Sequence, residues 1–374
     1  MKIQTRLSAS GLFEVVRTGF EKIIDGRAPE LIKISLPDTL MSGFALFSLK
    51  DPSLLAFDER RKVDNNLQRI FGIEQVPCDT QMRTTLDEVE LADVKVLGWA
   101  LVHPNLKEVI PLAPEMIIKQ DGADKNDCER NAAKRFFEQL RHDHPHLPVI
   151  IIEDALSSNA PHIRELEKYD CRYILGVKEG DHAFLFDWVA AAHQAGLTTD
   201  LEISGVGVTH KFRFINQVPL NQSNQDLLVN FIEYWEVRPD GKTQHFCWIT
   251  DFIVTGDNVF QLMRGGRSRW KIENETFNTL KNQGYHFEHN FWHGEKNLSG
   301  VFATLMMLAF LVDQVQQAAC RLFQAVLKQE GSRRGLWDHV RALFYALDFD
   351  SMEDIYRALL YGYKVTGLVI RTSS

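Results

Sequence analysis

A continuous run of mostly β-branched residues, Pro148-Val-Ile-Ile-Ile-Glu-Asp154, constrains the fold more than any other stretch of the chain. Such a run is typical of a strand that is buried on both faces, as in sheets covered by helices on both sides. The run ends in two carboxylates. Because ligand groups collect where the chain leaves the carboxyl end of a strand, Asp154 is a candidate site residue. The alternative role for Asp154 is to cap a helix that starts near Pro161.

The segments around this strand predict an α/β core. A turn signal, His103-Pro-Asn, separates two β-type runs and indicates a hairpin. The expected order is a hairpin (Val96–Val102 with Glu108–Leu112), a helix (Asp127–Leu140), a strand (Pro148–Asp154), a helix (Pro161–Asp170) and a strand (Arg172–Val177).

Changes of pattern along the chain predict further regions. Residues 1–90 have helical periodicity interrupted by prolines, and residues 200–254 are rich in strand signals, with a hairpin turn at Pro239-Asp-Gly241. The apolar stretch Leu298–Val312 predicts a buried helix, because it is shorter than the ~20 residues that span a bilayer. We expect a helical amino-terminal domain at 1–90, a core at 91–199 and 255–325, a β-rich insertion at 200–254 and a helical tail at 326–374.

A second informative stretch runs from Arg267 to Lys281 and predicts a helix that begins in a basic turn and stops at Gly284. Helical spacing places Trp270, Phe277 and Leu280 on one apolar stripe, with Glu273 inside it. Two interpretations of this carboxylate remain open. It pairs with Arg269, four residues earlier, or it ligates a metal while the nearby cations receive a phosphate backbone.

The net charge and the local charge of the chain give opposite indications about a nucleic-acid partner. A net charge of −8 disfavours a nucleic-acid partner, because phosphate neutralisation needs lysine and arginine. Local charge matters more for a site, and Arg264, Arg267, Arg269 and Lys271 lie close together at the start of the predicted helix. A second basic group is found near the carboxyl end, at Arg321, Lys328, Arg333, Arg334 and Arg341. Either group is also consistent with a solvated face.

The segment Arg269-Trp-Lys-Ile-Glu273, followed by Phe277, Leu280 and Lys281, resembles the signature of bacterial transposases of the insertion-sequence-four family. These are DDE enzymes with a ribonuclease-H-like core. Their signature contains a tyrosine, an arginine, the catalytic glutamate and a lysine. Arg269 and Glu273 match it, whereas Gly266 stands at the tyrosine position and Lys281 comes one position late. Glu275 is the rival for the glutamate.

The resemblance implies a fold, a cofactor and a partner. The fold would be an α/β ribonuclease-H-like mixed sheet with helices, in which Asp154 falls where the family has its second catalytic aspartate. Asp154 and Glu273 would be catalytic and would bind Mg²⁺ or Mn²⁺. The DNA contacts, to element ends and target, would be Arg267, Arg269, Lys271 and Lys281. A homodimer in the DNA complex is also implied.

A DDE centre needs three carboxylates to hold two divalent ions, and the first is not found. It belongs on an apolar strand upstream of the hairpin. Asp79, Asp87 and Asp93 are the nearby aspartates, and none of them follows an apolar β-type run. The sequence therefore suggests that a segment has been lost, and that this chain does not transpose.

Three functions consequently stay open: a transposase that cleaves and transfers DNA strands, a catalytically dead remnant that binds DNA, and an α/β protein unrelated to DNA. The five scattered cysteines contain no C-x-x-C pattern, which favours reduced thiols in the cytoplasm over a disulfide frame. The amino terminus lacks the apolar run of a signal peptide, so we expect a cytoplasmic protein with no membrane partner.

Overall fold

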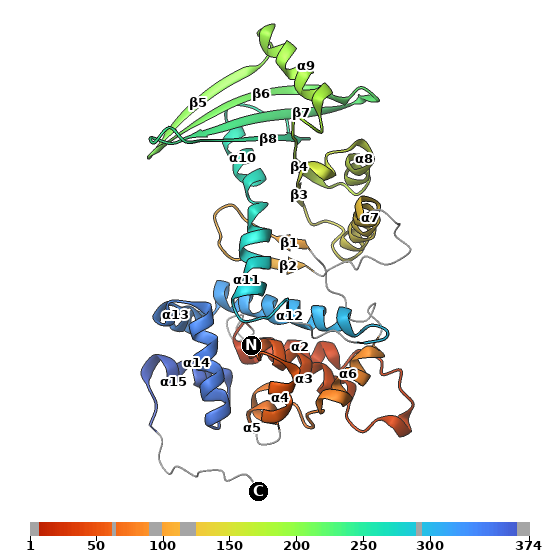
Figure 1. The fold of residues 1–374 in the computed structure, drawn as a ribbon, viewed down its shortest axis with the longest axis vertical. Coiled ribbons are helices and arrows are strands. Elements are labelled where there is room, and N and C mark those ends of the chain that lie inside the picture. The colour runs from red at the N-terminus through yellow and green to blue at the C-terminus, as the bar shows by residue number, and fades with distance from the viewer. Residues whose placement is uncertain (1–6, 62–64, 90–98, 113–124, 289–293, 365–374) are drawn as a thin grey trace. The chain divides into compact units, whose positions relative to one another are not determined.

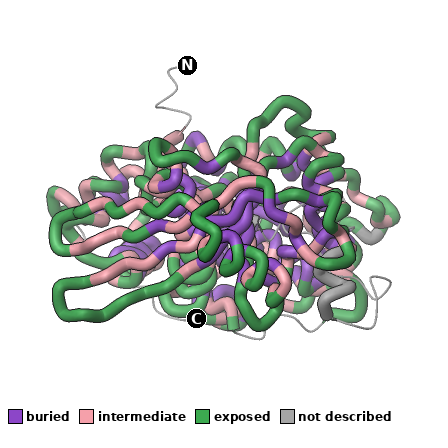
Figure 2. Tube along the Cα trace, turned by 90° about the horizontal axis from the view of Figure 1, so that it is seen from above, coloured by how far each residue is buried: buried purple, intermediate pink, exposed green. Residues whose placement is uncertain are grey.

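The computed structural model describes residues 7–61, 65–89, 99–112, 125–288 and 294–364, without the side chains of Leu31, Trp99 and residues 125–130. The chain divides into two compact units, whose elements are labelled in Figure 1. We call them the helical unit (Met1–Leu101, Glu108–Pro114 and Ile272–Ser374) and the sheet unit (Val102–Lys107 and Glu115–Lys271). Figure 2 marks the buried, intermediate and exposed residues along the trace.

The sheet unit is built on a mixed six-stranded sheet with the strand order β3-β4-β8-β7-β6-β5. Its strands are β3 (Ile150–Glu153), β4 (Arg172–Gly176), β5 (Thr199–Gly205), β6 (Val208–Asn221), β7 (Asn224–Val237) and β8 (Thr243–Thr250). β3 and β4 are parallel, and all other neighbours in the sheet are antiparallel. The fold class is therefore α/β, as the sequence predicts.

One face of this sheet carries an apolar core. Alternate residues of β6, β7 and β8 point to it, and they pack with the amphipathic helix α10 (Val259–Arg267). Its buried members include Ile174, Phe212, Phe214, Ile232, Tyr234, Trp248, Val259, Leu262 and Met263. The helix approaches β8 closely at Gly266, where an added Cβ would lie 2.6 Å from the indole Nε1 of Trp248. Glycine is thus required at this contact by the space that Trp248 fills.

The opposite face is apolar only in part. Helix α9 (Ala183–Gln194) covers it through Leu185 and Val189, and Phe186 meets Phe231 edge-on with ring centroids 5.4 Å apart. Helices α7 (Lys125–Asp143) and α8 (Ala160–Lys168) accompany the parallel strands β3 and β4. Farther along the sheet, the face that carries Phe231 is lined by charged and polar residues of β6, β7 and β8.

The helical unit consists mainly of helices packed around α3 and α12. The amino-terminal helices are α2 (Ala9–Phe20), α3 (Leu36–Ser48), α4 (Leu54–Arg61), α5 (Asn65–Phe71) and α6 (Asp79–Asp87). The carboxyl-terminal helices are α12 (Leu298–Ala319), α13 (Arg321–Glu330), α14 (Arg333–Ala346) and α15 (Met352–Tyr361). α3 is buried along nearly its whole length, which explains its apolar and small-residue composition.

A buried ion pair joins the two sets of helices. Lys50 Nζ lies 2.6 Å from Asp313 Oδ2, and the Tyr285 hydroxyl also donates to this oxygen. The ammonium group lies over the rings of Tyr285 and Trp337, at 4.1 and 4.0 Å from their centroids. Burial lowers the pKa of Lys50 to about 8 and raises that of Asp313, whereas the attraction between the two opposes both shifts.

Most of the predicted elements are confirmed. Strand β1 (Trp99–Leu101) pairs antiparallel with β2 (Ile110–Leu112) as the expected hairpin, which forms a two-stranded sheet of its own. The segment at 200–254, expected as an insertion, contributes strands to the same sheet as β3 and β4, because β4 pairs with β8. The ribonuclease-H-like arrangement of strands stays a prediction.

The predicted helix at Arg267–Lys281 is wrong in its start and in its apolar stripe. α10 begins at Val259, and the chain continues after a turn as a π-helix, η4 (Ile272–Phe277), and then as α11 (Asn278–Asn282). Trp270 and Phe277 are 53% and 39% exposed, and Glu273 is exposed rather than set in a buried stripe. Constant α-helical spacing does not hold over this stretch, because a turn at residues 268–269 precedes Trp270 and the i→i+5 pairing of the π-helix changes the twist from Ile272 to Phe277.

Among the described residues, one helix is long and apolar enough to cross a membrane by length and composition, namely α12. In the most apolar 18-residue window of this helix, 67% is buried inside the protein, as is typical of a core helix in a soluble protein. The prediction that Leu298–Val312 forms a buried helix is confirmed.

The close contact at Gly266 yields a stability prediction. Gly266→Ala should lower the free energy of unfolding by about 1–3 kcal/mol, because the methyl group overpacks against the rigid indole of Trp248. Gly19 of α2 is the control, since an added Cβ there meets nothing within 4 Å and alanine favours the helix by up to about 1 kcal/mol. Equal denaturant midpoints for Gly266→Ala and the unaltered protein would contradict the contact.

Candidate functional site

Asp154 follows β3 directly, at the point where the chain leaves the sheet. Its side chain accepts the N–H of Leu156 at 3.1 Å and so caps the short 3₁₀ turn Ala155–Ser157. The helix near Pro161 is capped by another residue, Asn159, whose side chain accepts the N–H of His162. The alternative that Asp154 caps this helix is therefore wrong, and Asp154 is exposed directly after the carboxyl end of β3.

A cavity of about 410 Å³ lies beside Asp154 in the sheet unit. Pairing between β4 and β8 ends at Val177, whose N–H donates to the carbonyl of Cys247 at 3.0 Å. The earlier part of β8 then lines the cavity together with the end of α10 and the residues after β3 and β4. Its charged and polar lining includes Glu153, Asp154, Lys178, Glu179, His245, Cys247, Arg267, Arg269 and Trp270.

Several of the charges in this lining are held by neighbours. Glu153 lies 2.5 Å from Nε2 of His162, and Arg267 donates to Glu236 at 2.7 Å. The Arg267 guanidinium also lies over the ring of Phe246, 4.5 Å from its centroid. These contacts fix Arg267 at the edge of the cavity and offset part of its charge.

The other predicted cations make contacts inside their own units. Lys271 donates to the backbone carbonyls of His103, at 2.7 Å, and of Leu106, so it holds the turn after β1. Arg264 donates to Asn105 in the same turn. In the helical unit, Lys281 pairs with Glu288 at 2.7 Å. The basic patch that the sequence predicts is therefore used in part to hold the fold.

The two predicted catalytic carboxylates belong to different compact units. Asp154 is in the sheet unit, and Glu273 is in the helical unit on the π-helix Ile272–Phe277, which also carries the half-buried Glu275. Their convergence on one metal site stays a prediction, as does the pairing of Arg269 with Glu273.

The aspartates considered for the first carboxylate have structural roles where they are described. Asp79 pairs with Arg83 at 2.5 Å. Asp87 accepts the N–H groups at the start of α12, at distances from 2.8 to 3.0 Å, and therefore caps that helix. Partial burial would raise the pKa of Asp87, but these donors outweigh it and lower the pKa. Asp93 lies outside the described residues.

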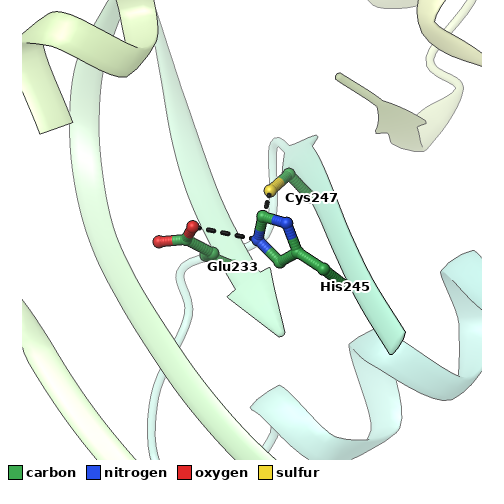
Figure 3. Close-up of side chains that lie close together, drawn as sticks. All are labelled: Glu233, His245 and Cys247. Carbon is green, nitrogen blue, oxygen red and sulfur yellow. Dashed lines mark hydrogen bonds and ion pairs between the residues drawn. The ribbon is translucent and has the colours of Figure 1, made fainter. Parts of the chain in front are cut away.

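A second cluster, which the sequence analysis missed, lies on β7 and β8. Glu233, His245 and Cys247 bring their ligand atoms within 4.8 Å of one another (Figure 3). His245 Nε2 is 3.0 Å from Glu233 Oε1 and 3.5 Å from Cys247 Sγ. Burial, with help from Glu233 and Glu179, raises the pKa of the Cys247 thiol. The turn at Pro239-Asp-Gly241 was a signal that could have revealed the cluster, because it sets Glu233 opposite Cys247.

Comparison of the chain with models of protein families and with curated proteins found no match.

The cap formed by Asp87 yields a pH-dependent prediction. Because the native pKa lies below the unfolded value of about 3.9, the carboxylate stabilises the fold above that pH. This contribution is lost as pH falls through the native pKa. Asp87→Ala should therefore lower the free energy of unfolding by about 1–2 kcal/mol at pH 7, with a smaller difference in acid.

The matched control for this cap is Asp79→Ala, which removes an i,i+4 pair with Arg83 worth about 0.3–0.5 kcal/mol. Denaturant unfolding of both variants between pH 3 and 7 measures the difference. If Asp87→Ala lowers the free energy of unfolding by the same amount at every pH from 3 to 7, the carboxylate cap is contradicted.

Proposed function

We propose that the chain is a cytoplasmic DNA-binding protein of the DDE transposase class, with a ribonuclease-H-like core. The observation that carries the proposal is the cavity at the end of β3, where Asp154 shares the lining with Lys178, Arg267 and Arg269. The three cations can contact a backbone phosphate, and they lie in the same lining as three acids, Glu153, Asp154 and Glu179.

The composition of the cavity lining supports a nucleic-acid partner. Lys178 is exposed at the turn after β4, and Trp270 is exposed at the end of the basic segment. Cations contact the phosphate backbone of any DNA, and an exposed aromatic ring next to them adds a surface on which a base of single-stranded DNA can stack. DNA is therefore the partner that these residues fit best.

The residues described do not fit a two-metal centre for Mg²⁺ or Mn²⁺. Such a centre needs carboxylates from several elements around one point. Among the described residues, the one group of at least three close ligand atoms is Glu233, His245 and Cys247, which does not include Asp154. Glu153 is bonded to His162, and Asp79 and Asp87 are engaged elsewhere. We therefore derive no strand-cleavage step and favour DNA binding over transposition.

Replacement of the cavity cations should weaken DNA binding. Lys178→Ala and Arg269→Ala should each lower the affinity for duplex DNA at all sequences, because each removes a cation that neutralises phosphate. The salt dependence of log K should become shallower by about 1 for each phosphate that is no longer neutralised. Fluorescence anisotropy at several salt concentrations measures both quantities.

The control for these variants is Lys242→Ala, which lies in the β7–β8 turn next to Asp240 and outside the cavity. We expect its affinity and salt slope to match those of the unaltered protein. Unchanged binding in the Lys178→Ala and Arg269→Ala double variant would rule out the cavity as the DNA site. A lack of DNA binding by the unaltered protein would favour an α/β protein unrelated to DNA.

A second experiment distinguishes DNA binding from transposase activity. We expect the purified chain to bind supercoiled plasmid without nicking it in Mg²⁺ or Mn²⁺, because among the described residues no group of three close ligand atoms includes Asp154. Agarose electrophoresis separates nicked from supercoiled plasmid. Metal-dependent nicking that Asp154→Ala abolishes, and Lys242→Ala retains, would show that the catalytic centre is complete.

A further inference from the structure

The cluster formed by Glu233, His245 and Cys247 has the donor atoms and the spacing of a metal site. Zinc takes imidazole nitrogen and carboxylate oxygen at about 2.0–2.2 Å and thiolate sulfur at about 2.3 Å, so the edges of its tetrahedron are about 3.4–3.6 Å. The Nε2–Sγ distance here is 3.5 Å and the Nε2–Oε1 distance is 3.0 Å. Small side-chain rotations would therefore be enough to bring Nε2, Sγ and Oε1 into the first coordination shell of one ion.

Hydrogen bonding explains this arrangement less well. Figure 3 shows the carboxylate and the thiol approaching the same ring nitrogen of His245, Nε2. One nitrogen carries at most one proton, so it can form one ordinary hydrogen bond and leaves the other neighbour without an equivalent contact. A cation placed between the three atoms would satisfy all of them.

The same geometry argues against a nucleophilic thiol. In a catalytic relay the nucleophile and the carboxylate bond to different nitrogens of the histidine ring, so that the ring passes a proton between its two sides. Here both groups meet Nε2. The cluster therefore lacks the order of contacts that would activate Cys247 as a nucleophile.

The sheet holds the three ligands firmly. Glu233 and Cys247 are direct partners in the β7–β8 register, and His245 lies two residues before Cys247 on the same face. The ring of Trp235, the register partner of His245, stacks on the imidazole with centroids 5.1 Å apart and planes within 8°. Arg213 lies 3.7 Å from the second oxygen of Glu233, Oε2, which directs Oε1 toward the cluster.

The cluster also opens toward the cavity beside Asp154, because His245 and Cys247 both line it. Three protein ligands and one open position are the arrangement in which zinc can hold water or another ligand. We propose that Glu233, His245 and Cys247 bind one transition-metal ion, with a fourth position open to this cavity. The soft thiolate and the imidazole make Zn²⁺ the expected ion. A thiolate and an imidazole do not suit Mg²⁺, so the site differs in kind from a carboxylate centre.

The test uses the full chain freed of metal by a chelator and then titrated with Co²⁺, a spectroscopic substitute for Zn²⁺. We expect one equivalent of Co²⁺ to produce a thiolate-to-cobalt charge-transfer band, and Zn²⁺ to displace it. Cys247→Ser should abolish the band, and Glu233→Gln should weaken Zn²⁺ binding by more than about 100-fold, beyond the effect of an outer-shell residue. Competition with a coloured chelator measures the Zn²⁺ affinity.

The matched control is Cys78→Ser, which removes a half-buried thiol of the helical unit. Circular dichroism checks that each variant is folded, and both Cys247→Ser and Glu233→Gln preserve side-chain shape. We expect Cys78→Ser to retain the band. A charge-transfer band that survives in Cys247→Ser would overturn the proposal, as would the lack of stoichiometric Co²⁺ binding by the unaltered chain. Because the readout does not involve DNA, failure of the DNA-binding proposal would leave this result independent.

Discussion

The sheet unit depends on the close packing of α10 against β8 at Gly266. Trp248 fills the space that a side chain at this position would need, so the helix can lie near enough to the sheet to bury Val259, Leu262 and Met263. The helix ends one residue later, at Arg267. Arg267 then lies at the edge of the cavity, bonded to Glu236, and the next residues complete the lining. Steric fit in the core thus determines the positions of the cations at the site.

The helical unit uses a buried ion pair where the sheet unit uses apolar packing. Removal of Lys50 and Asp313 from water is costly, and the pair is retained with two aromatic faces and a tyrosine hydroxyl around it. Gly284 makes room for this arrangement, because an added Cβ would lie 3.3 Å from Cβ of Lys50 and the residue has a φ of 97°. Removal of either charge would leave the other buried without its counterion, so we regard the pair as a specificity element rather than a source of net stability.

The sequence predicted those elements whose signals are local. The β-branched run before Asp154, the turn at Pro239-Asp-Gly241 and the apolar stretch of α12 all specify structure over a few neighbouring residues, and the structure has each of these elements. The expectation that the strand before Asp154 is buried on both faces is wrong, because β3 is the edge strand of the sheet and Ile150 is exposed. The join between β4 and β8 could not be predicted in this way, because it depends on contacts between distant segments. The π-helix at Ile272–Phe277 was missed because helical periodicity assumes a constant twist.

The candidate site shows the same division between local and distant information. Asp154 was found from the strand that precedes it, whereas the role of Asp87 depends on a helix that begins more than two hundred residues later. The Glu233, His245 and Cys247 cluster could have been found by extending the hairpin register from its turn, since every second pair lies on one face. The approach of Glu233 and Cys247 to the same nitrogen of His245, however, depends on side-chain rotamers that the strand register does not set.

Charge balance connects the two proposals. The cavity lining contains the cations Lys178, Arg267 and Arg269 together with the acids Glu153, Asp154 and Glu179, so its formal charges cancel. Glu236 further offsets Arg267, which means that a phosphate would meet less positive potential than the sequence suggests. A divalent ion bound by His245 and Cys247 would shift this balance toward positive charge at the cavity wall. Phosphate affinity should therefore depend on occupancy of the metal site, even though the ion would have no part in cleavage.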